Sequence, residues 1–250
     1  MFISEDKLIC YSFAIFIVAI VIFILYASYC HRNFLWMKYT CPNDWKLFKS
    51  MLSFTGSHLF SSVSMVLNGQ FVNVLLNMFF GPTVNAARGI STQLNNSVSG
   101  LVNNFQIAVN PQIVQSYSSG DKNTFYNLIN KSAKFSFFLL LIFVAPICLN
   151  IKEVLFFWLS SVPNYSDIFC VIIFLTTLFN SFSLPLATAA NATGNIKKFQ
   201  LYTGIAELSN IPLSYLFLKF GFSPVVVYII AFCIVFTTLL IRLAVLKKII

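Results

Sequence analysis

The sequence predicts an all-α membrane protein that crosses the bilayer about seven times. Hydrophobic residues occupy 58% of the 250 positions and charged residues only 9%, far below the quarter that is usual in soluble domains. The apolar residues form long runs without the two-residue alternation of barrel strands. Because an unpaired backbone amide is costly in hydrocarbon, such runs cross a membrane as helices.

Seven runs approach the length of about 20 residues that a spanning helix needs. The first run, 8–29, exceeds the 7 to 15 apolar residues of a signal peptide, so it predicts a retained span that forms one unit, 1–50, with the basic linker after it. The remaining runs predict a six-helix transmembrane lobe over 51–250. Its spans are expected at 51–80, 85–114, 134–157, 168–190, 199–218 and 224–246. The amphipathic stretch 122–134 predicts a helix lying along the inner membrane surface.

The net charge of +9 is distributed between the apolar runs. When loops alternate between the two sides, twelve basic residues, Arg242 among them, fall on one side and three on the other, with Arg88 inside a span. The positive-inside rule then places the N-terminus outside and the C-terminus in the cytoplasm. No basic patch with interleaved aromatic residues is present in the sequence, which argues against nucleic acid as a partner.

Four prolines fall in or near the ends of the expected spans: Pro111, Pro146, Pro185 and Pro212. Each removes a backbone donor and can kink its helix. Proline is also more frequent in membrane helices than in soluble ones, which is the simpler interpretation of any single one.

Residues suited to metal binding or catalysis are few. The six cysteines are scattered without a CxxC pair, and the only histidines are His31 and His58. Neither a disulfide framework nor a metal site is indicated. A membrane enzyme would need paired carboxylates or a catalytic histidine on a sizeable outer loop, so we expect neither an enzyme nor a bound cofactor.

Polar residues in the span 85–114 recur at intervals of three and four. They are Asn85, Arg88, Thr92, Asn96, Ser99, Asn103, Gln106 and Asn110. Residues at this spacing share one helix face, so they predict a continuous polar seam that cannot face lipid. In the preceding span Ser61, Ser64 and Asn68 follow the same spacing and predict an adjoining wall.

Two interpretations of this seam remain open. Asn, Ser and Thr can join helices through hydrogen bonds worth about 1 kcal/mol each, as a dry packing interface. A water-filled cavity that binds a polar substrate also needs such a wall, and an arginine within a span usually faces a cavity or a partner charge. The number of polar residues in register favours the cavity.

Two charged residues in the spans are further candidates. Arg88 lies about one turn inside its helix, where its guanidinium could hold an acidic group such as a pyrophosphate or reach the lipid headgroups. Glu207 is the one carboxylate deep in a span. It could couple transport to H⁺ or Na⁺, or serve as a neutral hydrogen-bonding group beside Asn210.

The segment FGPTVNAARGISTQLNNSVSGLVNNFQIAVNPQIVQSYSSGD, 80–121, resembles the corresponding stretch of the O-antigen and capsule flippases called Wzx, in the multidrug and polysaccharide exporter (MATE/MOP) superfamily. Similar signatures follow at 187–200 and 211–221. The resemblance covers most of the chain from about Asp44 onward. It implies that the seven expected spans correspond to the last helix of the first lobe and the whole second lobe of such transporters.

The resemblance implies a multi-pass protein of the bacterial inner membrane. It would flip an undecaprenyl-pyrophosphate-linked oligosaccharide from the cytoplasmic to the periplasmic leaflet by alternating access, for O-antigen, capsule or exopolysaccharide assembly. Family members have about twelve to fourteen spans, so the chain would act as a fragment or half of a full transporter. The implied partners are the bilayer, the glycolipid, an N-terminal lobe, and polysaccharide polymerase or chain-length proteins.

Two alternatives stay open. A MATE-type ion-coupled multidrug exporter would share the helix plan but would carry cationic drugs. A truncated membrane protein that transports nothing would tolerate apolar substitutions along the polar seam.

Overall fold

The computed structural model describes residues 7–34, 44–159, 161–194 and 197–249. The chain divides into two units, Met1–Lys49 and Ser50–Ile250, each considered by itself. The first unit contributes α1 (Lys7–Asn33), an apolar helix with His31 and Arg32 in its last turn. Part of the basic linker expected in 1–50, residues 35–43, lies outside the described residues.

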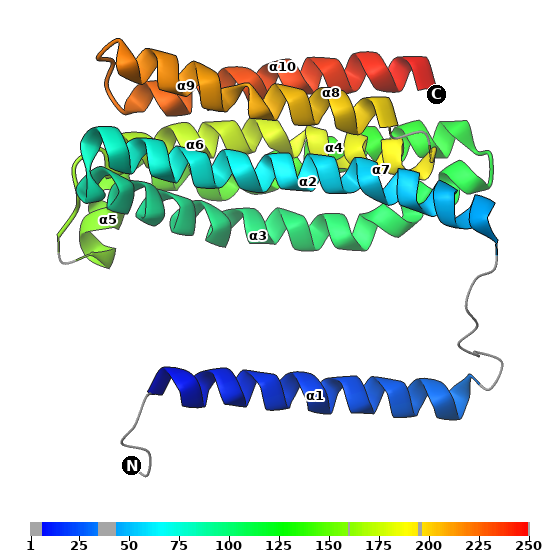
Figure 1. Ribbon diagram of the computed structural model, residues 1–250. Coiled ribbons are helices and arrows are strands. Elements are labelled where there is room, and N and C mark those ends of the chain that lie inside the picture. The colour runs from blue at the N-terminus through cyan, green and yellow to red at the C-terminus, as the bar shows by residue number, and fades with distance from the viewer. Residues whose placement is uncertain (1–6, 35–43, 160, 195–196, 250) are drawn as a thin grey trace. The chain divides into compact units, whose positions relative to one another are not determined.

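All regular structure described in the second unit is helical, as the sequence predicts, and the helices run back and forth in one bundle (Figure 1). Two long helices open it and are followed by shorter ones. The helices are α2 (Trp45–Phe80), α3 (Pro82–Ser118), α4 (Lys122–Leu149), α5 (Ile151–Trp158), α6 (Ser166–Ser181), α7 (Ser183–Ala192), α8 (Lys197–Leu208), α9 (Asn210–Lys219) and α10 (Val225–Ile249).

Five segments among the described residues are long and apolar enough to cross a membrane: 10–33, 45–80, 122–149, 166–192 and 225–247. Two of the seven expected spans fall short of this standard. The helix α3 is long enough but too polar, and the expected span 199–218 is divided between α8 and α9. Because α3 nevertheless packs against α4, α6 and α7, it belongs to the bundle.

The stretch 122–134 is not a separate surface helix. It forms the first turns of α4. Asp121 caps the start of this helix, and its carboxylate accepts the backbone N–H of Thr124 at 3.0 Å. Hydrogen bonds from the Thr124 side chain and backbone lower the pKa of Asp121 below its usual value. Phe125 and Ile129 are buried, because their apolar face packs into the lobe instead of the lipid surface.

Two prolines coincide with the breaks inside the expected spans. Pro185 lies four residues after the end of α6 at Ser181, and Pro212 lies four residues after the end of α8 at Leu208. A proline has no N–H to bond the carbonyl four residues before it, so each helix is interrupted where that bond would form. Pro111 and Pro146, by contrast, lie inside the uninterrupted helices α3 and α4.

Three apolar clusters hold the lobe together along its length. One joins α2 and the start of α3 to α6, α9 and α10, and includes Leu76, Ala87 and Phe169. The second joins α3, α4, α5 and α6. The third joins the far part of α3 to α4, α7, α8 and α10. The clusters therefore pack α3 along its length, and the C-terminal part of α2, against the rest of the lobe.

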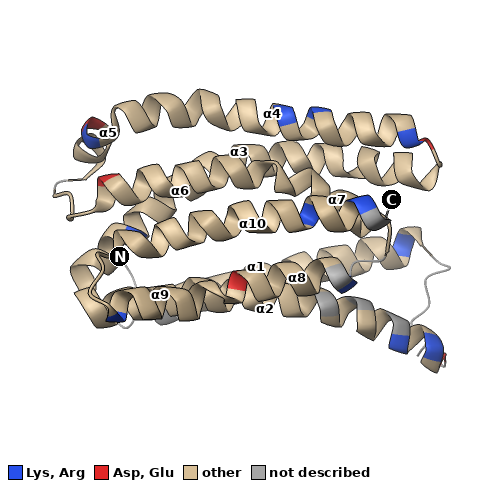
Figure 2. Cartoon of the chain, turned by 90° about the horizontal axis from the view of Figure 1, so that it is seen from above, with Lys and Arg blue, Asp and Glu red and all other residues tan. Residues whose placement is uncertain are grey.

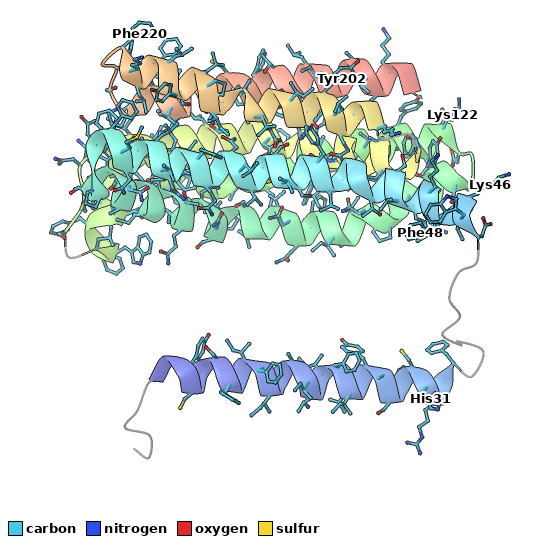
Figure 3. All side chains as sticks on the ribbon, in the orientation of Figure 1. His31, Lys46, Phe48, Lys122, Tyr202 and Phe220 are labelled. Atoms are coloured by element: carbon cyan, nitrogen blue, oxygen red, sulfur yellow. The ribbon has the colours of Figure 1, made fainter. Side chains whose placement is uncertain are left out.

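Outside these clusters much of the lobe surface is apolar. Tyr202 on α8 and Phe220 after α9 point outward (Figure 3). On α4, the exposed residues beyond Lys134 are all apolar, among them Phe135, Phe138 and Ile142. In water such a surface would be an aggregation liability, whereas in a bilayer it contacts lipid. The chain is thus a multi-pass helical membrane protein.

The α2–α8 contact depends on a glycine. A Cβ at Gly204 would lie 2.7 Å from Cε1 of Phe60 and 3.3 Å from Oγ of Ser64. We expect Gly204→Leu to lower the unfolding free energy by about 1–3 kcal/mol, because an added side chain separates two packed helices. The thermal unfolding midpoint in detergent measures this effect.

The matched control is Gly56→Leu on α2, where a Cβ would meet no atom within 4 Å. It should leave the midpoint unchanged or raise it, since leucine favours helix more than glycine does. Equal losses in both variants would mean that the close approach at Gly204 does not determine stability.

Candidate functional site

The eight polar residues predicted to form one seam on α3 lie in three different environments. Asn96 and Asn103 are exposed on the lobe surface. Gln106 and Asn110 bond to neighbouring helices. The remaining four, Asn85, Arg88, Thr92 and Ser99, are half-buried. The structure therefore divides the seam along its length, and whether any of it contacts a substrate stays a prediction.

The C-terminal part of the seam joins α3 to α4 and α7. Gln106 is only 5% exposed, and its Nε2 donates to the hydroxyls of Ser132 at 3.0 Å and Ser136 at 2.7 Å on α4. On the facing helix α7, Thr188 donates to Oδ1 of Asn110 at 2.8 Å. These contacts match the packing interpretation of the seam for this part of α3.

The N-terminal part of the seam borders a cavity of about 340 Å³ between α2, α3, α6, α9 and α10. Arg88 and Thr92 line it from α3, and Asn68 and Asn210 line it from α2 and α9. Further along its wall are Met65, Gly69, Val72, Ile173, Thr176, Thr177, Val227, Tyr228 and Ala231. The cavity is thus an open recess between these helices, with a mostly apolar lining that includes one guanidinium and several hydroxyl and amide groups.

The break between α8 and α9 positions one of these residues. Asn210 is the first residue of α9; its Nδ2 donates to Oδ1 of Asn68 at 2.9 Å, and its own Oδ1 accepts the hydroxyl of Ser214 at 3.0 Å. The chain of hydrogen bonds connects α2 to α9 at the cavity wall. Both the amide nitrogen and the oxygen of the buried Asn210 therefore have a partner, as buried amides require.

Arg88 crosses from α3 to α2. One of its terminal guanidinium nitrogens donates to the backbone carbonyl of Gly69 at 3.0 Å. The side chain is directed to the interior of the lobe, and it also interacts electrostatically with Tyr228 on α10. Asn85, one turn earlier, has a buried Oδ1 with no hydrogen-bond partner among the described residues.

The adjoining wall predicted on α2 is only partly at the cavity. Of its three residues, Asn68 lines the cavity, whereas Ser64 is buried and donates to the carbonyl of Phe60 in its own helix at 2.7 Å. Ser61 is half-buried. Nearby, Nδ1 of His58 lies 3.3 Å from Nε2 of Gln200 on α8, which is a structural use of the imidazole.

A second polar row on α3 escaped the sequence prediction. Gln93, Ser97 and Asn104 are exposed and lie beside the exposed Asn96 and Asn103. We call these five residues the α3 polar face. The signal was present in the sequence, because Gln93, Ser97, Gly100 and Asn104 also follow intervals of four, three and four.

Glu207 has a partner that the sequence did not reveal. Its Oε1 lies 3.9 Å from a terminal nitrogen of Arg242 on α10, and the two side chains are 24% and 15% exposed. Arg242 also lies over the ring of Phe199, 5.8 Å from its centroid. Arg242 is therefore an interior member of an ion pair, not a free charge of the inner loops as the alternation of loops suggested.

Of the remaining basic residues, some lie along α4, such as Lys131 and Lys134, and most of the others lie near the two ends of the lobe (Figure 2). Lys122 begins α4, Lys197 begins α8 and Lys247 lies near the end of α10, and these positions share one end of the bundle (Figure 1). Lys152 and Lys219 lie at the other end. Among the described residues, no group of three or more His, Cys, Asp or Glu side chains could hold a metal ion.

A bundle of apolar helices with an arginine and amide groups in the wall of a cavity between them, and with no surface domain among the described residues, is typical of a membrane transporter. The comparison with family models agrees: the model of the MatE family matches residues 58–216. The chain belongs to the MatE family, whose members are transporters. Neither a curated protein nor a solved structure matches it.

The hydrogen bonds of Gln106 can be tested by truncation. We expect Gln106→Ala to lower the unfolding free energy by about 1 kcal/mol, because it leaves the hydroxyls of Ser132 and Ser136 without their partner. Asn103→Ala, one turn away and exposed, serves as the control and should have little effect. A thermal unfolding midpoint that drops equally in both would contradict the packing role.

The Glu207–Arg242 pair calls for a double-mutant cycle. Either Glu207→Gln or Arg242→Gln alone leaves one buried charge without its partner and should cost up to about 3 kcal/mol. The double variant should unfold at a higher temperature than the worse single variant, because it removes both charges. Strictly additive losses would mean that the two side chains do not interact.

Proposed function

We propose that this MatE-family chain moves a lipid-linked oligosaccharide across the bilayer, with the α3 polar face in contact with the sugar. The observation that carries the proposal is the contrast between two exposed helix surfaces of the same lobe. The exposed residues of α4 beyond Lys134 are apolar, whereas α3 exposes five polar side chains between Gln93 and Asn104.

Lipid is a poor neighbour for the α3 polar face. Each amide or hydroxyl that lacks a partner in hydrocarbon costs several kcal/mol, so the face borders water, a polar solute or another polypeptide. Amide and hydroxyl groups donate and accept hydrogen bonds without carrying charge. They therefore suit the hydroxyl groups of an oligosaccharide, which present the same donors and acceptors.

The charges favour this substrate over a cationic drug. A site for organic cations would use a carboxylate at the cavity or face, yet the α3 polar face contains none. Glu207, the one carboxylate described deep in a span, is paired with Arg242. Ion-coupled drug export is compatible with the family, but a neutral substrate agrees better with these side chains.

The glycolipid substrate implies a place and an orientation. We assign the chain to the bacterial plasma membrane, with the N-terminus outside and the C-terminus in the cytoplasm. The lysines at the starts of α4 and α8 and near the end of α10 then lie on the cytoplasmic side, as the positive-inside rule requires. The partners of this transport remain the glycolipid, the bilayer and the opposing lobe implied by the resemblance.

The flipping activity can be measured in proteoliposomes that contain the chain and an undecaprenyl-pyrophosphate-linked oligosaccharide with a fluorophore on the sugar. A membrane-impermeant quencher reports the fraction of sugar in the outer leaflet. We expect the chain to convert the protected inner fraction into a quenchable one. The double variant Asn96→Leu/Asn104→Leu should slow this conversion at least tenfold, because it removes sugar contacts from the polar face.

The matched control is Asn130→Leu, the same change at an exposed asparagine of α4. It should flip at the wild-type rate. Equal rates in liposomes with and without the chain would refute the proposal. Loss of an organic cation from the same liposomes, without sugar flipping, would instead identify a drug exporter.

A further inference from the structure

The cavity beside Arg88 has a positive charge and no negative one. Of the residues that line it, Arg88 alone is charged, and the others are apolar or carry neutral hydroxyl and amide groups. We infer that this cavity binds a small monovalent inorganic anion, such as chloride, at Arg88 and Tyr228, as a site distinct from the α3 polar face.

The guanidinium of Arg88 has unused donors. A guanidinium has five N–H groups; one donates to the carbonyl of Gly69, and the Tyr228 hydroxyl oxygen is close enough to accept another, so further N–H groups remain for a ligand. Arg88 is half-buried, and a charged group drawn out of water carries a cost unless a counterion or water compensates it. An anion in the cavity supplies that compensation.

A second donor points to the same place. The Tyr228 hydroxyl belongs to a side chain that is only 6% exposed. Its oxygen lies near enough to Arg88 to accept from the guanidinium, and its own O–H has no acceptor among the described residues. Buried hydroxyls almost always find a partner, and an anion beside Arg88 would accept this O–H.

The other polar groups of the wall favour an anion over a cation. Asn68 and Asn210 bond each other, and the hydroxyls of Thr176 and Thr177 donate to Ile172 and Asn95. No carboxylate is present among the lining residues to attract a cation past Arg88. The donors still available are the guanidinium, the Tyr228 hydroxyl, the hydroxyl of Thr92 and the amide nitrogen of Asn68, whose oxygen alone is engaged by Asn210.

The ligand's charge and the position of the site separate it from the glycolipid. One guanidinium neutralises one negative charge, whereas a pyrophosphate would leave excess charge in the cavity. On a helix with 3.6 residues per turn, Gln93, Ser97 and Asn104 lie about 140 to 180° around α3 from Arg88, whereas Asn96 and Asn103 lie about 60 to 80° from it. A sugar on Gln93, Ser97 and Asn104 and an anion in the cavity therefore contact different sides of α3, with Asn96 and Asn103 between them.

The test uses the purified full-length chain in detergent, with sodium chloride, sodium gluconate or sodium pyrophosphate at equal ionic strength. A ligand that binds only the folded state raises the thermal unfolding midpoint. At a chloride concentration about ten times the dissociation constant, we expect chloride to raise the midpoint by about 3 °C relative to gluconate. Arg88→Gln should abolish this rise, and Tyr228→Phe should shift it to higher chloride concentration.

Lys152→Gln, which removes a positive charge from the exposed start of α5, should keep the full response to chloride. If Arg88→Gln does not fold, Tyr228→Phe decides the matter, because it removes a single hydroxyl.

Identical midpoints in chloride and gluconate would overturn the inference, as would a chloride response that persists in both variants. Stabilisation by pyrophosphate but not chloride would also overturn it and assign Arg88 to the glycolipid headgroup. Sugar flipping is measured separately, so either proposal can fail alone.

Discussion

The lobe is organised by the need of polar groups to find partners where lipid offers none. The helix α3 is where this constraint is felt most, because it is long enough to span the membrane but too polar to do so alone. Its buried polar residues bond to α4, α6 and α7. Ser91 is an example, since its hydroxyl donates to Ala87 in its own helix and lies 3.2 Å from the carbonyl of Ser166 on α6. The packing of α3 against three helices is what permits its sequence inside a membrane.

The same constraint explains the consequences of the two broken spans. Pro185 and Pro212 each free a carbonyl, and in a protein-lined interior the freed groups can be tolerated. The break before α9 turns Asn210 toward Asn68, and that contact closes one side of the cavity. A continuous helix over 199–218 would carry Asn210 in a different register relative to α2. Pro212 therefore affects the cavity wall through the side-chain amide of Asn210.

The sequence predicted the helices well because apolar runs of about 20 residues are a strong and local signal. It predicted the residues of the α3 seam as neighbours for the same reason, since spacing alone puts them on related faces. Spacing cannot say what each part of a face meets. Gln106 meets Ser132 and Ser136, whereas Asn103, one turn away, meets no other helix closely enough to be buried. That difference depends on how α4 lies along α3, which is tertiary information.

The Glu207–Arg242 pair was missed for a related reason. The two residues are 35 positions apart on α8 and α10, and counting charges by loop assigns Arg242 to a membrane surface. Once the helices pack, the guanidinium lies over Phe199 and beside the carboxylate. The long arginine side chain allows this, because its apolar stem can lie along the helix while its charged end reaches inward. Hydropathy treats such a residue as a boundary marker, although here it is an internal contact.

The two sides of α3 separate two kinds of chemistry. Arg88 and Thr92 turn a cationic, interior side toward α2 and α10, while Gln93, Ser97 and Asn104 turn a neutral, amide-rich side outward. An uncharged surface can release a neutral sugar readily, since it forms many modest hydrogen bonds and no strong ionic one. A charge kept inside the lobe can meanwhile hold α2 to α3 through the Gly69 carbonyl. An anion at Arg88 would meet the same guanidinium that joins α3 to α2, so the two contacts draw on different N–H groups of one side chain.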